Sequence, residues 1–171
     1  MSKLLEDMLT LSSNDANQFS IHKEAVELDT LLLDVYESFE PMALAKKQII
    51  RIQLPEDLLP PCHCDKERMY QVFAILLHNA ISYTPESGNI QLTLIKTKER
   101  FSISFADSGV GIPDEEKEKI FDRFYRSEKA RNTKGHFGLG LAIAYEIVHA
   151  HHGSIVVSDT PNGGATFTVF L

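Results

Sequence analysis

The most informative stretch of the chain is Asp107-Ser108-Gly109-Val110-Gly111-Ile112-Pro113. The residues before it, 101–106, alternate apolar and small polar side chains, which is the period of a half-buried strand. This strand would end on the Asp107 carboxylate, which is well placed to accept a hydrogen bond from an amino group of a ligand. The two glycines let the backbone approach a flat ring, where a Cβ atom would collide. Taken alone, the stretch also fits an ordinary connection from a strand to a helix that Pro113 opens.

A second glycine-rich stretch follows further along the chain, Gly135-His136-Phe137-Gly138-Leu139-Gly140-Leu141-Ala142-Ile143. It leads directly into an apolar segment with helical spacing, which we expect to reach His152. The glycine-rich start of a helix offers free backbone N–H groups at the positive end of the helix dipole, and such a start binds anions readily. A ring-binding turn together with an anion-binding helix start predicts a nucleotide.

Length and composition exclude several classes of protein. The chain has 171 residues, enough for one compact domain and a short appendage, and 43% of them are hydrophobic, enough for a full core. The formal net charge of −7 argues against a nucleic-acid-binding surface. No apolar run is long enough to span a membrane and no signal peptide is visible, so we expect no direct membrane contact.

The cysteines and the C-terminal histidines give no strong metal pattern. Cys62 and Cys64 flank His63, and neighbouring strand positions do not easily form a disulfide, which indicates reduced thiols in a cytosolic protein. A metal site there would need further ligands that no spacing supplies. The three histidines at 149, 151 and 152 could suggest zinc, but histidines in the last turn of a helix are also favoured by the helix dipole.

The first 17 residues form a segment of their own. Residues 1–16 carry an apolar stripe at helical spacing, and residues 12–18 are polar and interrupt it. The stripe either packs on its own domain or belongs to the end of a longer helix. We favour the longer helix, because so short a helix is not stable alone. The domain boundary is therefore expected near residue 18, with one domain over residues 18–171.

The body of the chain alternates helical and strand patterns. We expect an extended piece at 19–26 and three long helices, at 28–47, at 66–83 after an Asp65 cap, and from the second glycine-rich stretch to 152. Strands are expected at 48–54, 60–64, 89–97, 100–106, 154–158 and 166–171. Helical spacing assigns to the buried side of the first helix Leu31, Leu32, Val35, Phe39, Met42 and Ala43. This pattern predicts an α+β fold, a two-layer sandwich whose mixed sheet of about five strands is covered on one face by three helices.

Four motifs occur in an order that resembles one family. They are His78-Asn79-Ala80-Ile81-Ser82-Tyr83-Thr84, Asp107-Ser108-Gly109-Val110-Gly111-Ile112, Phe121-Asp122-Arg123-Phe124-Tyr125-Arg126 and Gly138-Leu139-Gly140-Leu141-Ala142-Ile143. The chain resembles the catalytic ATP-binding domain of a bacterial two-component sensor histidine kinase, whose fold is shared with DNA gyrase, a heat-shock chaperone and mismatch-repair ATPases. The resemblance covers nearly the whole chain. It implies that residues 1–17 are the end of the second dimerisation helix and a linker.

The resemblance implies an adenine site around Asp107. This carboxylate would read the adenine, Gly109 and Gly111 would shape the floor under the ring, and Thr166 would help through a water. Tyr83 and Ile112 would flank the ring, although core packing is an equally ordinary use of both side chains.

The resemblance also implies a phosphate and metal site. Asn79 would bridge Mg²⁺ and the phosphates, since an amide oxygen is a sound ligand for a hard cation. Between Arg126 and Gly138 lies a stretch that matches the family's mobile ATP lid, and its basic side chains suit a triphosphate. Asn79 and Arg126 would be catalytic. The nucleotide-binding set would comprise Asn79, Tyr83, Asp107, Gly109, Gly111, Ile112, Tyr125, Arg126, Arg131, Lys134, Gly138, Leu139, Gly140, Leu141 and Thr166.

The chain departs from the family pattern in three ways. The family usually has an asparagine one helical turn before Asn79, where this chain has Ile75, and a lysine at the position of Ser82. Both changes put the Mg²⁺ affinity and the transfer rate in doubt. None of the seven histidines has the context of the family's phosphoacceptor, so we expect the acceptor to lie N-terminal to Met1.

Three functions therefore remain open. The first is the ATP-binding half of a working histidine kinase, expected in the cytoplasm as part of a membrane-bound sensor, that phosphorylates a histidine in its own dimer and then a response-regulator aspartate. The second is a weakened or inactive kinase module that binds nucleotide as a structural switch. The third is another ATPase of the same fold or an anti-sigma serine kinase, which the segment at 1–17 disfavours. A P-loop NTPase is excluded, because its Gly-x4-Gly-Lys-Ser/Thr motif is absent.

Overall fold

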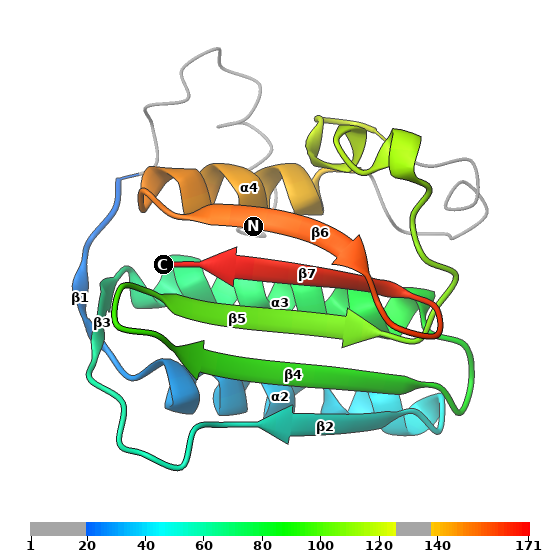
Figure 1. The fold of residues 1–171 in the computed structure, drawn as a ribbon, viewed down its shortest axis with the longest axis horizontal. Coiled ribbons are helices and arrows are strands. Elements are labelled where there is room, and N and C mark those ends of the chain that lie inside the picture. Colours follow the sequence, from blue (N-terminus) through cyan, green and yellow to red (C-terminus); the bar gives the residue numbers. More distant parts are fainter. Residues whose placement is uncertain (1–19, 126–137) are drawn as a thin grey trace, which may run out of the picture.

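A computed structural model describes residues 20–125 and 138–171. Its main sheet has the strand order β2-β4-β5-β7-β6, with β2 at Ile49–Gln53, β4 at Asn89–Lys96, β5 at Phe101–Asp107, β6 at Ser154–Asp159 and β7 at Ala165–Phe170. β2 pairs with β4 in parallel and the other pairs are antiparallel, so the sheet is mixed. The helices α2 (Leu28–Ala45), α3 (Lys66–Tyr83) and α4 (Gly140–Ala150) cover one face of it (Figure 1). The predicted α+β sandwich is confirmed.

A small second sheet and two short helices complete the described chain. β1 (Glu24–Val26) pairs antiparallel with β3 (Cys62–Cys64), away from the main sheet. Both cysteines are buried and free of disulfides. The charged stretch after Pro113 forms two 3₁₀ helices, η1 at Asp114–Glu116 and η2 at Lys119–Phe121, in place of one longer helix. The expected lid and the segment at 1–17 lie outside the described residues.

The core lies between the sheet and α3. Along β5, every second residue from Phe101 to Asp107 is buried, as expected for a strand with one face against helices. The ring of Phe105 packs at 5.7 Å from the ring of Phe73 on α3. α3 itself packs against α2 and α4, so it is the central helix of the layer (Figure 1). None of the helices in the described ranges has the length and apolar character needed to cross a bilayer.

Two predictions about helices had different outcomes. α3 has the predicted bounds, and the Asp65 side chain caps it by accepting a hydrogen bond of 3.0 Å from the Arg68 N–H. α2 ends at Ala45, two residues earlier than predicted, and the placement of Met42 in the core was wrong, since 41% of Met42 is exposed. α2 lies at one side of the helix layer and, among the described elements, packs mainly against α3 and β2 (Figure 1), whereas helical spacing alone does not say on how many sides a helix has neighbours.

Asp65 also joins the start of α3 to two other parts of the chain. Its carboxylate accepts a hydrogen bond of 2.9 Å from the backbone N–H of His22, and its own N–H lies 3.0 Å from Nε2 of His151. A backbone N–H can only donate, so Nε2 of His151 must be an acceptor. The proton is therefore on Nδ1, which lies 2.8 Å from the carbonyl oxygen of Ile147. His151 is thus fixed as a neutral ring, and this use explains the histidine without a metal.

Burial lowers the pKa of His151 below its ordinary value, assisted by the nearby charges of Lys23 and His152 and opposed by the hydrogen bond to Ile147 and the charge of Asp65. Below about pH 6.5, the His151 ring therefore binds a proton in the unfolded chain more readily than in the folded chain. We expect the free energy of unfolding to fall as the pH drops through this range, by at most about 1.4 kcal/mol per pH unit. Urea unfolding of the wild type and of His151→Gln between pH 7.5 and 5.5 measures it.

The pH dependence should be weaker in His151→Gln than in the wild type. The matched control is His63→Gln, which removes an exposed histidine of β3 that is not among the groups acting on the pKa of His151, and it should keep the pH dependence of the wild type. An unchanged pH dependence in His151→Gln would show that His151 is not held neutral.

Candidate nucleotide-binding site

The carboxylate of Asp107 is the centre of the candidate site. It lies at the end of β5 and is only 5% exposed. Its Oδ1 atom accepts hydrogen bonds from the backbone N–H groups of Gly109, at 2.8 Å, and Ala165, at 3.2 Å. Burial raises the pKa of the Asp107 carboxyl above its usual range, and the two backbone hydrogen bonds only partly oppose this effect. An N–H donor on a ligand would therefore stabilise the ionised carboxylate further.

Glycines allow three backbone segments to meet at Asp107. A Cβ atom on Gly109 would overlap the carbonyl oxygen of Tyr83, at the end of α3, and would lie 2.8 Å from Oδ1 of Asp107. Gly164 precedes β7 and has a φ of +101°, and a Cβ atom there would overlap the carbonyl oxygen of Asp107. Gly111 has a φ of +69°, the left-handed region that favours glycine. The close approach therefore requires glycine at these positions.

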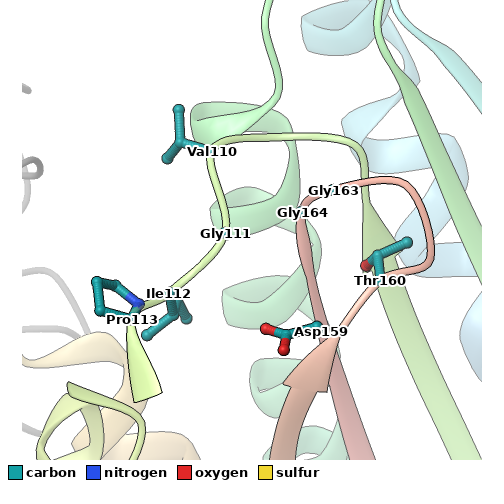
Figure 2. A pocket seen from close by; sticks show the side chains of 8 residues that line it. All are labelled: Val110, Gly111, Ile112, Pro113, Asp159, Thr160, Gly163 and Gly164. Carbon is teal, nitrogen blue, oxygen red and sulfur yellow. The ribbon is translucent and has the colours of Figure 1, made fainter. Parts of the chain in front are cut away.

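A cavity of about 370 Å³ lies beside Gly111 and Gly164 (Figure 2). Its walls are the loop at 110–113 and the turn between β6 and β7, with Asp159 and Thr160 on the turn side. Asp159 forms an ion pair of 2.8 Å with Lys117. Asp107 and Asn79 do not line this cavity, which adjoins the surroundings of Asp107 through Gly164 and its neighbour Gly111.

The turn between β6 and β7 was not predicted as part of the site. The sequence indicated a turn there, yet Gly164 packs on Asp107 and the following Ala165 donates to its carboxylate. The signal was the pair Gly163-Gly164 directly before the last strand, since two glycines suggest a close backbone approach as well as a turn.

The start of α4 supplies the second half of the candidate site. The N-cap residue, Leu139, has an apolar side chain that cannot cap the helix, so it leaves the first N–H groups of α4 open to a partner such as an anion. Leu139 is buried and Leu141 packs against the core, so both could offer a ligand only their backbone groups. Gly138 has a φ of +71°, and its carbonyl oxygen accepts a hydrogen bond of 3.0 Å from the N–H of Phe124.

The C-terminal half of α3 lies against the start of α4. A Cβ atom on Gly140 would lie 3.3 Å from Cγ2 of Ile75. Asn79 and Tyr83 follow Ile75 at successive turns of α3, and both are half-buried. Within the described parts of the chain, the Asn79 side chain makes no hydrogen bond. The structure thus brings Ile75, at the position of the family's first asparagine, to the start of the glycine-led helix.

Not all predicted site residues gather here. Ile112 and Tyr125 pack partly against the core, the ordinary use of such side chains. Thr166 pairs with Ala106 across the sheet, so its side chain lies on the face opposite Asp107, and its hydroxyl lies 2.9 Å from that of Thr160. The residue of β7 beside the carboxylate is Ala165. Arg126, Arg131 and Lys134 lie outside the described residues.

Several known proteins resemble this chain in sequence and fold. The family model described as histidine kinase-, DNA gyrase B- and HSP90-like ATPase matches residues 64–171. The adaptive-response sensory kinase SasA of Microcystis aeruginosa is 34% identical over 98% of this chain and 43% of its own length. The signal transduction histidine-protein kinase BaeS of Escherichia coli is 34% identical over 100% of this chain and 36% of its own. The chain thus spans less than half of the length of these relatives.

Solved structures share the fold. Full-length ShkA in complex with AMPPNP matches with a TM-score of 0.81 and 28% identity, over 98% of this chain and 34% of ShkA. Histidine kinase ThkA in complex with the response regulator protein TrrA matches with a TM-score of 0.80 and 27% identity, over 98% of this chain and 46% of ThkA. The resemblance to histidine kinase catalytic domains is therefore confirmed. The chain belongs to the family of histidine kinase-, DNA gyrase B- and HSP90-like ATPases.

Proposed function

We propose that this chain binds ATP and presents its γ-phosphate to a histidine of a dimerisation domain, as the catalytic domain of a sensor histidine kinase. The observation that supports this most directly is the buried carboxylate of Asp107, held by the Gly109 and Ala165 N–H groups. The exocyclic amino group of adenine is the kind of N–H donor that this carboxylate lacks. A guanine would present a carbonyl oxygen at the same position, which the carboxylate would repel.

The residues around Asp107 fit the rest of a nucleotide. Gly109 and Gly111 remain our candidates for the floor under a flat ring, and the end of α3 at Tyr83, which is half-buried, packs against Gly109. The start of α4, without a side-chain cap, would face the phosphates with its backbone N–H groups. Arg126, Arg131 and Lys134 remain our candidates for phosphate contacts, with Arg126 as a catalytic group. Thr166 could take part only from the opposite face of the sheet, so we expect little from it.

Asn79 is our candidate ligand for Mg²⁺. Its side chain is half-buried on α3 and makes no hydrogen bond to a described residue. Amide oxygens ligate hard cations, and Mg²⁺ usually takes its remaining ligands from water and phosphate. A bound Mg²⁺ would neutralise charge on the phosphates. Asn79 would hold the ion, and the α3 packing would fix the direction from which Asn79 reaches it.

The partners follow from the same proposal. The dimerisation domain would come from the same protein, as a homodimer, and would carry the acceptor histidine. A response regulator would then receive the phosphoryl group on an aspartate. The likeness to ThkA, solved with the response regulator protein TrrA, supports this partner class. We propose a cytoplasmic location for the domain, and we propose no nucleic-acid partner for a chain with a net charge of −7.

A weakened or inactive kinase module is the second candidate, and Ile75 favours it. This residue of α3 packs against the start of α4 and takes the position at which the family usually has an asparagine. Isoleucine cannot ligate a cation or orient a water. The module would still bind nucleotide through Asp107. It would transfer phosphate slowly and act mainly through its shape.

Asp107→Asn tests the adenine site. Asparagine keeps an oxygen that can accept from the Gly109 and Ala165 N–H groups, so the substitution removes mainly the charge. The loss of a charged hydrogen bond costs about 1.5–3 kcal/mol, which corresponds to an ADP affinity that is roughly 10- to 150-fold weaker. Isothermal titration calorimetry with ADP measures it.

Asp34→Asn is the matched control, because Asp34 is an exposed carboxylate on α2 and its substitution changes the net charge equally. It should bind ADP like the wild type. Equal ADP affinities of the wild type and both variants would contradict the assignment of Asp107 to the adenine site.

Ile75→Asn tests the metal site. With Asn79 as the only asparagine of α3, we expect nucleotide binding by the wild type to depend weakly on Mg²⁺. The added amide should raise this dependence, and the transfer of phosphate to an added dimerisation domain should become faster if the missing ligand is the only defect. The substitution also places a polar group in a half-buried position, which costs about 1–3 kcal/mol of stability. Calorimetric titrations with and without Mg²⁺ measure the effect.

Ile75→Ala is the control, since it shortens the side chain without adding a ligand and should keep the weak Mg²⁺ dependence. A strong Mg²⁺ dependence in the wild type, unchanged by Ile75→Asn, would mean that the metal lies elsewhere.

A further inference from the structure

The C-terminal end of α3 is held by two side chains from the turn between α2 and β2. The ammonium of Lys46 donates to the carbonyl oxygens of Ile81, at 2.6 Å, and Thr84, at 2.9 Å, and lies 3.4 Å from that of Ser82. The amide nitrogen of Gln48 donates to Ile81, at 3.0 Å, and Thr84, at 2.7 Å. We call Lys46 and Gln48 the α3 clamp. They satisfy the last carbonyl groups of the helix, which have no partner within it.

The local backbone explains how both side chains reach α3. Lys47, between them, has a φ of +54°, so the chain turns sharply after α2. The N–H groups of Lys46 and Gln48 both bond to the carbonyl oxygen of Ala43, at 3.1 and 2.9 Å. The side chain of Lys47 instead pairs with the exposed carboxylate of Glu86, at 2.8 Å. This turn directs the first and third residues to the helix end and the second to solvent.

A chain of direct contacts links the α3 clamp to the carboxylate of Asp107. The carbonyl groups that it holds flank Tyr83, and the Tyr83 carbonyl oxygen packs against Gly109 so closely that a Cβ atom would not fit. The Gly109 N–H in turn donates to the carboxylate of Asp107 at 2.8 Å. A shift of the α3 end would therefore move the loop that carries the Gly109 donor. Asn79 lies on the same last turns of α3.

Stability alone does not explain Gln48. The residue is only 4% exposed, and its Oε1 atom has no hydrogen-bond partner in the part of the chain that the structure describes. An unpaired buried oxygen is destabilising and offsets the bonds that the amide donates. The carbonyl groups of Ile81 and Thr84 also receive Lys46, so they would stay paired without Gln48. We therefore expect the net effect of the Gln48 amide on folding to be small, while its two hydrogen bonds still constrain the helix end.

We propose that Lys46 and Gln48 are positioning residues of the nucleotide site, acting through the carbonyl groups at the end of α3. The inference rests on the proposed ATP binding and names residues that set its geometry without touching the ligand. Because each carbonyl group of the pair at 81 and 84 has two donors, either residue can be replaced singly without leaving these carbonyls unpaired.

The test is Gln48→Met, which keeps the length of the side chain and removes the amide. We expect its ADP affinity to fall by about 5- to 10-fold, a loss comparable to one hydrogen bond, while its urea midpoint stays close to that of the wild type. Lys46→Arg keeps the charge and the donors and should bind closer to the wild type than Lys46→Met does.

A second readout follows the backbone directly. The amide resonance of Gly109, observed by NMR in the protein without nucleotide, should shift in Gln48→Met. The control is Val26→Ala, a buried residue of β1 that is remote from the α3 clamp. It should lower the urea midpoint without changing the ADP affinity or the Gly109 resonance.

Each outcome has a definite meaning. If the wild type does not bind ADP, the proposed function fails and takes this inference with it. If the wild type binds ADP while Gln48→Met matches it in affinity and in the Gly109 resonance, only the positioning role is overturned. An affinity loss in Gln48→Met that Val26→Ala reproduces at an equal loss of stability would likewise overturn the positioning role.

Discussion

The close approach of Gly109 and Gly164 to Asp107 is the constraint on which the rest of the structure depends. Three segments from distant parts of the chain meet there, and two of them touch through backbone atoms alone. Such a contact tolerates no side chain, so it fixes residue types at several positions at once. It also fixes the layer behind it, because the end of α3 must lie where its Tyr83 carbonyl meets Gly109.

The layered packing supplies the rigidity that this contact needs. α3 is the central helix, with large buried residues that include Met69, Phe73 and Leu76, and it is tied at both ends by side chains. Asp65 caps its start and the α3 clamp holds its end. Sites built on well-packed elements keep their geometry better than sites on loops. The candidate site combines both, with a rigid helix on one side and glycine loops on the other.

The sequence was a good guide wherever the determining interactions are local. The cap at Asp65 and the apolar spacing of α3 depend on residues within a few positions, and both bounds of that helix were predicted. Contacts between distant segments were not accessible in this way, as the α3 clamp and the contact of Gly164 with Asp107 show. Thr166 illustrates a third limit. Side chains alternate along a strand, so an offset of one residue moves a side chain to the other face, and the register places Ala165 beside Asp107.

The hydrogen bond between the Phe124 N–H and the Gly138 carbonyl oxygen has a consequence for how such a domain can change over evolution. It closes a loop whose two ends are fixed to the body of the protein. The entropy of closing a flexible loop grows slowly with its length, by about 0.6 kcal/mol per doubling. Insertions or deletions between these two residues would therefore cost the fold little. The stability of the fold therefore constrains the length of the chain between Phe124 and Gly138 only weakly.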